Sequence, residues 1–514
     1  MKKQTYLFAT ALVSLLALSS CGSNGDQCQS NCEKACSKKA CENVCSKKAC
    51  ENIPVKEYTS AKLYMTSKDS DLRISEVDVK VEEGQDFAPM FFSYVDPTHQ
   101  FQKMVGIGGA ITDAVSINFS ELSPELQEEF LNAYFDKEKG IGYTMIRTHI
   151  NSCDFGPESY TYVEDNDSTL STFDISHDKE LRLPLIKKAM EKSNNTISLL
   201  LSAWSAPAWM KDNNSRVQGG HILPECNQMW SDYIVKYIKE VENYGVPVWG
   251  LTAQNEPQAT QTWESCIFSA EEQRDYVKNY LGPTLWNNGM KDKKLIIFDH
   301  NRDIMFHYAL TVLNDPEAAK YVWGTGAHWY ETWRDYVVGS EAGMNFAAAR
   351  GVKEAFPDKE LAFTEGCVEG FSWEKANDWG FGEKYAYSIL NDLNCGTSSW
   401  TDWNILLNHY GGPTWIKNFC LAPVHMTEDK KLVYTNAYYY IGHFSKFIQP
   451  GARRVSSCSD RSDFETTAFI NTDGSLSVVA LNRKDYAMDF AIVVGNKSYK
   501  AKLNPHSIAT LVLK

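Results

Sequence analysis

The segment VWGLTAQNE, residues 248–256, decides the fold class because its apolar run ends in an amide and a carboxylate side by side. Pro257 follows at once and stops the run. Such a run is typical of a short buried strand, and an Asn after it is also the ordinary start of a turn. The context of Asn255 and Glu256 therefore has to decide between a turn and a functional site.

The same pattern recurs along the chain. Eight short apolar segments predict buried strands: MVGIGGA (104–110), YTMIRTHI (143–150), ISLLLSAW (197–204), VWGLTAQNE (248–256), KLIIFDH (294–300), VWGTGAHWY (322–330), LAFTEGC (361–367) and SSWTDWN (398–404). Amphipathic stretches between them, such as 123–135, 271–285 and 343–356, predict helices. Eight strands alternating with helices predict an α/β fold, a (β/α)8 TIM barrel over residues 104–430.

The ends of these segments favour a barrel over an open sheet. Most of them carry side chains able to do chemistry: Arg147, Trp204, Asn255, Glu256, His328, Tyr330, Glu365, Trp400 and Asp402. In a TIM barrel the C-terminal ends of the strands form the active face. An open dinucleotide-binding sheet would need a GxGxxG loop, and GIGGA (106–110) lacks that spacing.

Both flanks of the barrel segment have β character. Residues 55–103 include the alternating run SEVDVKVEE (75–83), and residues 431–514 include SLSVVALN (475–482). Turn signals such as TDGS separate the C-terminal runs. We therefore expect a β-sandwich attached to the barrel and formed from N- and C-terminal segments.

The first 54 residues do not read as part of the fold. Lys2 and Lys3 precede a short apolar run that ends at Cys21, which predicts a lipoprotein signal peptide over 1–21 with lipidation at Cys21. The alternative is an ordinary signal peptide with an incidental Cys. We expect an exported bacterial lipoprotein, anchored to the membrane on its periplasmic or cell-surface face.

Residues 22–54 are rich in Cys and contain the repeat CSKKACENV, CSKKACENI. The segment has too few apolar residues for a core, so we expect a tether. Local disulfides and thiolate metal binding both stay open, although the spacing is not that of a paired CxxC zinc site. The seven Cys from Cys153 to Cys458 show no motif and are expected to act as small buried hydrophobes.

Composition excludes some partners. The net charge is −14, and no Lys/Arg-rich stripe appears in the body, so a nucleic-acid partner is not expected. The chain has 14 Trp and 26 Tyr, residues that are often half-buried where apolar rings meet polar ligands. Sugar-binding clefts are one such environment.

Glu256 and Glu365 end the fourth and seventh predicted strands, which face each other across the mouth of a barrel. Retaining glycoside hydrolysis needs two carboxyls about 5–5.5 Å apart, one as acid/base and one as nucleophile. We expect a charged neighbour to raise the pKa of Glu256, which keeps it protonated while Glu365 attacks. The alternative is two unrelated surface carboxylates.

Neighbouring residue types fit a sugar site. Asn255 could hold the 2-hydroxyl of the sugar. Tyr330 could donate a hydrogen bond to Glu365, and Arg147 could keep Glu365 ionised. A sugar ring could pack on the side chains of Trp204, Trp263 and Trp403. Each also has an ordinary role in rim packing or an ion pair. His328 is expected to orient a neighbour by a hydrogen bond rather than ligate a metal. A GxSxG elbow for an esterase is lacking.

Thirteen motifs between about residue 98 and the C-terminus resemble, in order, those of glycoside hydrolase family 30, in its glucosylceramidase (acid β-glucosidase) branch. They are GIGGAITDA, GIGY.MIR, SCDF, SAWSAPAWMK, QNEP, QRDYVKNYLGPTL, DPEAAKYV, HWY, TEGC, WTDWN, GGPTWIKNF, GHFSKFI and LNR. The resemblance implies a barrel with a β-sandwich, retaining hydrolysis, and no metal or organic cofactor.

The resemblance also implies residue roles. Glu256 in QNEP matches the acid/base and Glu365 in TEGC the nucleophile. Five residues match those that bind the terminal glucose: Asp154, Trp204, Asn255, Trp403 and Asn418. Three match the shell around the nucleophile: Arg147, His328 and Tyr330.

One departure affects the substrate. The loop after QNEP, QATQTWESCIFSAEEQRD, is shorter than in glucosylceramidases and lacks their aromatic pair, for which Trp263 is a candidate substitute. The expected substrate is therefore a carbohydrate or glycolipid with β-linked glucose, with the leaving group open. The leading function is an exo-acting β-glucosidase. Alternatives are an endo-β-1,6-glucanase or β-xylosidase of the same family, and a catalytically inactive carbohydrate-binding lipoprotein.

Overall fold

The computed structural model describes residues 57–84, 90–331 and 344–514, all within one compact unit that spans Val55–Lys514. The expected signal peptide, the lipidation site at Cys21 and the Cys-rich tether lie outside the described residues. Within the described part of the chain, no helix combines the length and the apolar character that crossing a membrane requires.

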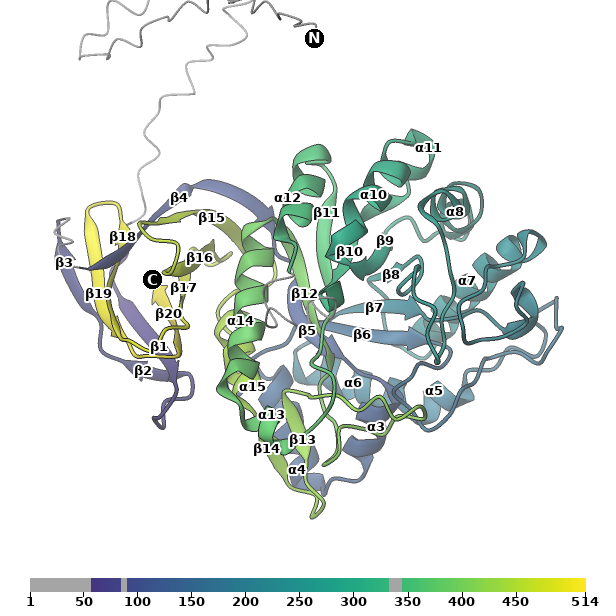
Figure 1. Cartoon of the computed structure of the whole chain (residues 1–514), viewed down its shortest axis with the longest axis horizontal. Coiled ribbons are helices and arrows are strands. Elements are labelled where there is room, and N and C mark those ends of the chain that lie inside the picture. Colours follow the sequence, from purple (N-terminus) through teal and green to yellow (C-terminus); the bar gives the residue numbers. More distant parts are fainter. Residues whose placement is uncertain (1–56, 85–89, 332–343) are drawn as a thin grey trace, which may run out of the picture. The chain divides into compact units, whose positions relative to one another are not determined.

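The centre of the fold is a closed barrel of eight parallel strands (Figure 1). In chain order these are β5 (Gly106–Ala110), β6 (Met145–Ile150), β7 (Ser198–Ala203), β8 (Gly250–Thr252), β9 (Lys294–Asn301), β10 (Val322–His328), β11 (Glu360–Glu365) and β12 (Thr397–Asn404). Each strand pairs with its sequence neighbours, and β12 closes the ring onto β5. All eight predicted strands are present, so the TIM barrel is confirmed.

The glycine-rich segment GIGGA is strand β5 itself. A Cβ atom added at Gly108 would lie 1.8 Å from the carbonyl oxygen of Met145 on β6, a distance that no real Cβ reaches. Glycine is required here because the backbones of β5 and β6 pack closely.

Helices connect the strands. They are α3 (Asp113–Ser120), α4 (Pro124–Phe135), α5 (Ser176–Glu180), α6 (Arg182–Lys192), α7 (Asn227–Asn243), α8 (Ala270–Tyr276), α9 (Gly282–Asn287), α10 (Arg302–Leu313), α11 (Pro316–Ala319), α12 (Phe346–Ala355), α13 (Trp373–Asn377), α14 (Trp379–Asn394) and α15 (Asn436–Ser445). At the start of α4, the Ser123 hydroxyl accepts a hydrogen bond from the Leu126 N–H, and Pro124 occupies the first turn, where its missing N–H costs nothing. The helix predicted over 271–285 is divided by a π-helical turn, Val277–Leu281, just before Pro283.

The second structural element is a sheet of ten strands in the order β2-β1-β20-β17-β16-β15-β4-β18-β19-β3. Its members are β1 (Ala61–Ser67), β2 (Ser75–Val77), β3 (Lys80–Glu83), β4 (Phe91–Lys103), β15 (Arg453–Ser459), β16 (Glu465–Ile470), β17 (Leu476–Asn482), β18 (Met488–Val494), β19 (Lys497–Leu503) and β20 (Ser507–Leu513). N-terminal β1 pairs with C-terminal β20 along its whole length, and β4 lies between β15 and β18. In Figure 1 the purple and yellow strands accordingly lie side by side. The predicted β-sandwich from both terminal segments is confirmed.

Residues 431–452, expected in the sandwich, instead hold β14 (Leu432–Tyr434), which pairs with β13 (Val424–Met426), and α15. Helix α15 packs against α14, a helix of the barrel. The buried His443 of α15 hydrogen-bonds Thr66 of β1 at 3.0 Å and Thr510 of β20 at 2.9 Å. Burial lowers the pKa of His443 to about 3, so a neutral ring joins the helix to both terminal strands.

Candidate active site

The fourth barrel strand is shorter than predicted. Strand β8 ends at Thr252, and three residues separate it from Glu256. Backbone bonds to the two neighbouring strands nevertheless continue, from Ala253 N to Ile296 O at 2.8 Å, Asn255 N to Ala203 O at 2.9 Å, and Glu256 N to Asp299 O at 2.9 Å. The segment from Ala253 to Glu256 is therefore held by backbone hydrogen bonds to β7 and β9, as a strand would be.

Glu256 and Asp299, at this end of the barrel, both have left-handed backbone conformations. The φ angles are 44° at Glu256 and 67° at Asp299, and the N–H of the first donates to the carbonyl of the second. Such conformations cost on the order of 1–3 kcal/mol in non-glycine residues and cluster at functional sites. The sharp turn at Glu256 points its carboxyl toward the carboxyl of Glu365.

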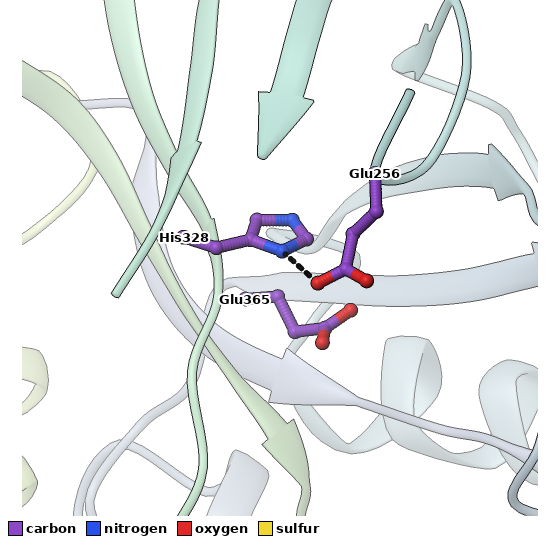
Figure 2. Close-up of side chains that lie close together, drawn as sticks. All are labelled: Glu256, His328 and Glu365. Atoms are coloured by element: carbon purple, nitrogen blue, oxygen red, sulfur yellow. Dashed lines mark hydrogen bonds and ion pairs between the residues drawn. The ribbon is translucent and has the colours of Figure 1, made fainter. Parts of the chain in front are cut away.

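Glu256, His328 and Glu365 lie together at the C-terminal end of the barrel (Figure 2). One carboxylate oxygen of each glutamate and one His328 ring nitrogen all lie within 4.8 Å of one another. Nδ1 of His328 hydrogen-bonds Oε1 of Glu256 at 3.2 Å. The side chains of Glu256 and Glu365 are only 11 % and 8 % exposed, so they are not unrelated surface carboxylates.

Arg147, in the middle of β6, donates to the Ser202 hydroxyl through Nε at 3.1 Å and to three further side chains through its two terminal nitrogens. Its guanidinium is fully buried, and Nη1 donates to Oε2 of Glu365. Nη2 donates to the side-chain oxygen of Asn255 at 2.8 Å and to Oδ2 of Asp299 at 3.0 Å. A charged fork with three oxygen partners fixes the position of each of them.

Asp299, which ends the apolar part of β9, is a site residue that the sequence analysis did not single out. Its second oxygen, Oδ1, pairs with Nε2 of His328 at 3.0 Å. Burial alone would raise the pKa of Asp299, but the charges of Arg147 and His328 hold it well below its usual range. An ionised Asp299 therefore orients both cations, and its place in IIFDH at a strand end was the available signal.

Aromatic rings surround the carboxyl pair. The rings of Trp204 and Trp403 are stacked, with centroids 5.3 Å apart. The guanidinium of Arg147 lies 4.8 Å from the centre of the Trp204 ring. Tyr330 donates a hydrogen bond from its hydroxyl to Oε1 of Glu365 at 2.9 Å. Trp263 packs against the buried apolar cluster that contains Trp204 and Trp403. The structure thus brings these predicted residues together.

Asp154 and Asn418 form a polar pair beside these rings. The side-chain amide of Asn418 donates to Oδ2 of Asp154 at 2.5 Å. Burial raises the pKa of Asp154 well above its usual value, and the charge of Glu365 adds to this effect. By contrast, Trp400 and Asp402 are directed elsewhere, to Asp392 and Tyr385 of α14, and take no part in the site.

The pKa order of the two glutamates is the reverse of the expected one. Burial alone would raise the pKa of Glu256, but the hydrogen bond from His328 and the charge of His300 hold it below its usual value. Burial raises the pKa of Glu365, which the charges of His328 and Arg147 only partly oppose. The prediction assumed a charged neighbour that raises the pKa of Glu256, whereas the neighbour in contact is cationic.

The same three side chains are also the candidate metal site. Among the described residues, Glu256, His328 and Glu365 form the group with ligand atoms close enough to share one ion. Their atoms are already used, because Arg147 binds Glu365 and a charged His328 offers no lone pair to a cation. The arrangement therefore fits proton transfer better than metal binding.

Charge on His328 predicts a pH-dependent stability. Burial alone would lower its pKa, but the carboxylates of Glu365 and Asp299 raise it from 6.5 to about 9. A raised folded-state pKa stabilises the fold fully below pH 6.5, and this contribution is lost as pH rises through 9. We expect unfolding free energy, measured by urea titration, to fall by about 3 kcal/mol over that window.

His328→Gln should abolish this pH-dependent contribution. His425→Gln is the matched control, because His425 is equally buried and its pKa is lowered to about 4, so it has no proton to lose there. The interpretation is wrong if His328→Gln keeps the full slope between pH 6.5 and 9.

Comparison with known proteins agrees with this geometry. The sequence profile described as "Glycosyl hydrolase family 30 TIM-barrel domain" matches residues 104–448, and "Glycosyl hydrolase family 30 beta sandwich domain" matches residues 451–511. The lysosomal acid glucosylceramidase of Mus musculus is 38 % identical over 433 residues, which is 81 % of this chain and 82 % of the mouse protein.

Two solved structures are similar over most of the chain. SrfJ from Salmonella typhimurium is 31 % identical with a TM-score of 0.81, over 88 % of this chain and 99 % of SrfJ. The endo-β1,6-glucanase BT3312 is 25 % identical with a TM-score of 0.77, over 88 % of this chain and 98 % of BT3312.

Proposed function

This chain belongs to glycosyl hydrolase family 30 and is a glycoside hydrolase, and from that premise we propose that it is an exo-acting β-glucosidase of the glucosylceramidase type. The observation that carries this proposal is the 38 % identity to the mouse glucosylceramidase over four fifths of both chains.

In the proposed mechanism Glu365 attacks the anomeric carbon while Glu256 donates a proton to the leaving oxygen. Glu256 then takes a proton from water, and that water releases glucose from Glu365 with retained configuration. Carboxylate oxygens within 4.8 Å support retention, since inverting enzymes place the two carboxyls about 6.5–9.5 Å apart.

The surrounding residues have supporting roles in this proposal. Arg147 and Tyr330 hold the attacking oxygens of Glu365, and Asn255 is placed to meet the sugar 2-hydroxyl. Glu365 has to be ionised to attack, and the charges of His328 and Arg147 favour that form although burial opposes it. Glu256 has to carry a proton to donate, and His328, which adjoins it, is positioned to influence that proton.

The sugar itself is proposed to lie between the ring pair and the polar pair. Trp204 and Trp403 would contact its apolar face, and Asp154 with Asn418 would bind its hydroxyls. Trp263 would line the entrance on the side of the leaving group.

The second candidate function is an endo-β-1,6-glucanase. The likeness to BT3312, at 25 % identity and a TM-score of 0.77, favours it, and the shortened loop after Pro257 leaves more room for a second sugar. The two functions differ in where the chain of sugars is cut.

Product analysis tests the choice. The full chain is incubated with glucosylceramide, gentiobiose, reduced-end-labelled β-1,6-glucan oligosaccharides and an aryl β-xyloside, and products are separated by chromatography. We expect glucose as the sole early sugar product. Labelled oligosaccharides of intermediate length among the first products would overturn exo action, and a preference for the xyloside would identify a β-xylosidase.

The proposal extends to location. The apolar run ending at Cys21 supports a lipid-anchored, exported enzyme. Cys21→Ser, expressed in a bacterial host, is expected to move glucosidase activity from the membrane pellet to the soluble fraction. Activity of the unmodified chain already in the soluble fraction would contradict the anchor.

A further inference from the structure

Two buried cysteines meet directly behind the candidate active site. Cys367 and Cys420 are 5 % and 3 % exposed, and both are free thiols in the structure. Both side chains belong to one apolar cluster, together with Trp204, Trp403 and Tyr330. Cys153 belongs to the same apolar cluster, but its thiol contacts the carbonyl of Phe155 instead.

The backbones that carry the two thiols are already paired. Leu421 N donates to Val368 O at 2.8 Å, Gly370 N donates to Phe419 O at 2.9 Å, and Glu369 forms a bridge with Cys420. In this antiparallel pairing Cys367 and Cys420 are diagonal neighbours on one face. Diagonal neighbours usually have Cα atoms about 7–8 Å apart, and a disulfide spans about 4.4–6.8 Å, so a sulfur–sulfur bond requires the two segments to move closer by about 1 Å.

Each thiol adjoins a different part of the sugar site. Cys367 lies two residues after Glu365, and its sulfur is 3.4 Å from the hydroxyl of Tyr330. Cys420 lies two residues after Asn418, and its sulfur is 3.4 Å from the Asn418 carbonyl. The pair thus connects the segment after the proposed nucleophile with the segment that presents Asn418 to Asp154.

We propose that Cys367 and Cys420 form a disulfide that locks the Asn418 segment onto the end of β11. The oxidant is a second disulfide, of a thiol oxidoreductase or of oxidised glutathione. Two S–H bonds and the oxidant's S–S bond break, one new S–S bond forms, and two electrons and two protons pass to the oxidant, which leaves as two thiols. The backbone pairing of the two segments and the packing of both side chains in one buried cluster carry this assignment.

The bond forms during folding rather than afterwards. The neighbouring Cys420, together with burial, raises the pKa of Cys367 well above its usual value, so the folded thiol is a poor nucleophile. The hydroxyl of Tyr330 keeps its own hydrogen after oxidation and still donates to Glu365. Oxidation is therefore expected to leave kcat within about twofold.

The test compares the full chain isolated from an oxidising bacterial periplasm with the same chain isolated from a reducing cytoplasm. Non-reducing peptide mapping is expected to show the Cys367 and Cys420 peptides joined only in the periplasmic protein. The oxidised form should melt about 3–8 °C higher. Its KM for an aryl β-glucoside should be about two- to fivefold lower, because the binding segment is held in place.

Cys420→Val and Cys226→Val provide the matched pair of variants, since both replace a buried Cys by an apolar side chain of similar size. Cys420→Val should abolish the melting difference between the two preparations, and Cys226→Val should keep it. Separate alkylation of both thiols in the periplasmic protein would overturn the proposal. So would a joined pair whose melting temperature and KM equal those of Cys420→Val.

Discussion

Replacing Glu365 by Gln is expected to lower kcat on an aryl β-glucoside by at least about 10⁴-fold, because an amide cannot attack the anomeric carbon. Gln preserves the size of the side chain and an acceptor for Tyr330, so folding should survive. The loss should appear in kcat more than in KM, since the missing interaction is made only during bond breaking.

Glu360→Gln is the control for this experiment. Glu360 begins the same strand, β11, and lies at the opposite end of the barrel. Its replacement should leave kcat within about twofold. Thermal melting of both variants shows whether the barrel is intact. More than a few per cent of residual activity in a folded Glu365→Gln protein would mean that another group is the nucleophile.

Replacing Glu256 by Ala is expected to separate good leaving groups from poor ones. A sugar with an alkyl leaving group should react about 10²–10⁴-fold more slowly, because its oxygen receives no proton. A dinitrophenyl leaving group needs no proton, so attack by Glu365 stays fast and the glycosyl-enzyme accumulates as a burst.

Azide provides the sharpest discrimination between the two glutamates. With Glu256→Ala, azide enters the space left by the carboxylate and releases the glycosyl-enzyme as the β-glucosyl azide. With Glu365→Ala, azide attacks the substrate directly and gives the α-anomer. Nuclear magnetic resonance of the azide product assigns each role, and the opposite pairing of variant and anomer would reverse the assignment.

The barrel was predictable because its signal is local and repeated. Each of the eight strands is a short apolar run, and the alternation with helices leaves few arrangements. The end of β8 was predicted wrongly, because the chain after Thr252 stays bonded to β7 and β9 while it leaves strand geometry. The pattern of apolar residues shows which residues are buried. A buried strand and a buried, hydrogen-bonded segment without strand geometry have the same pattern.

The sequence predicted most of the residues that meet in the site, but it did not predict the order of the pKa values of Glu256 and Glu365. Glu365 ends β11, Glu256 follows the end of β8, and Arg147 lies within β6 with its side chain in the barrel, so the closed barrel brings the three together. Asp299 was missed since an acidic residue at a strand end has many ordinary explanations. The pKa order depends on the contact between His328 and Glu256, a distance that no spacing in the sequence contains.

The pairing of β1 with β20 can form only after almost the whole chain has been synthesised. Residues 61–67 wait for residues 507–513, which a ribosome adds roughly 20–90 s later at about 5–20 residues per second. Every strand of the barrel emerges before β15 does, so the catalytic part of the chain can close while β1 still lacks β20 and β4 still lacks β15 and β18. We therefore expect the C-terminal strands to act as the finishing step of folding, and a chain shortened by its last strand to leave an aggregation-prone edge exposed.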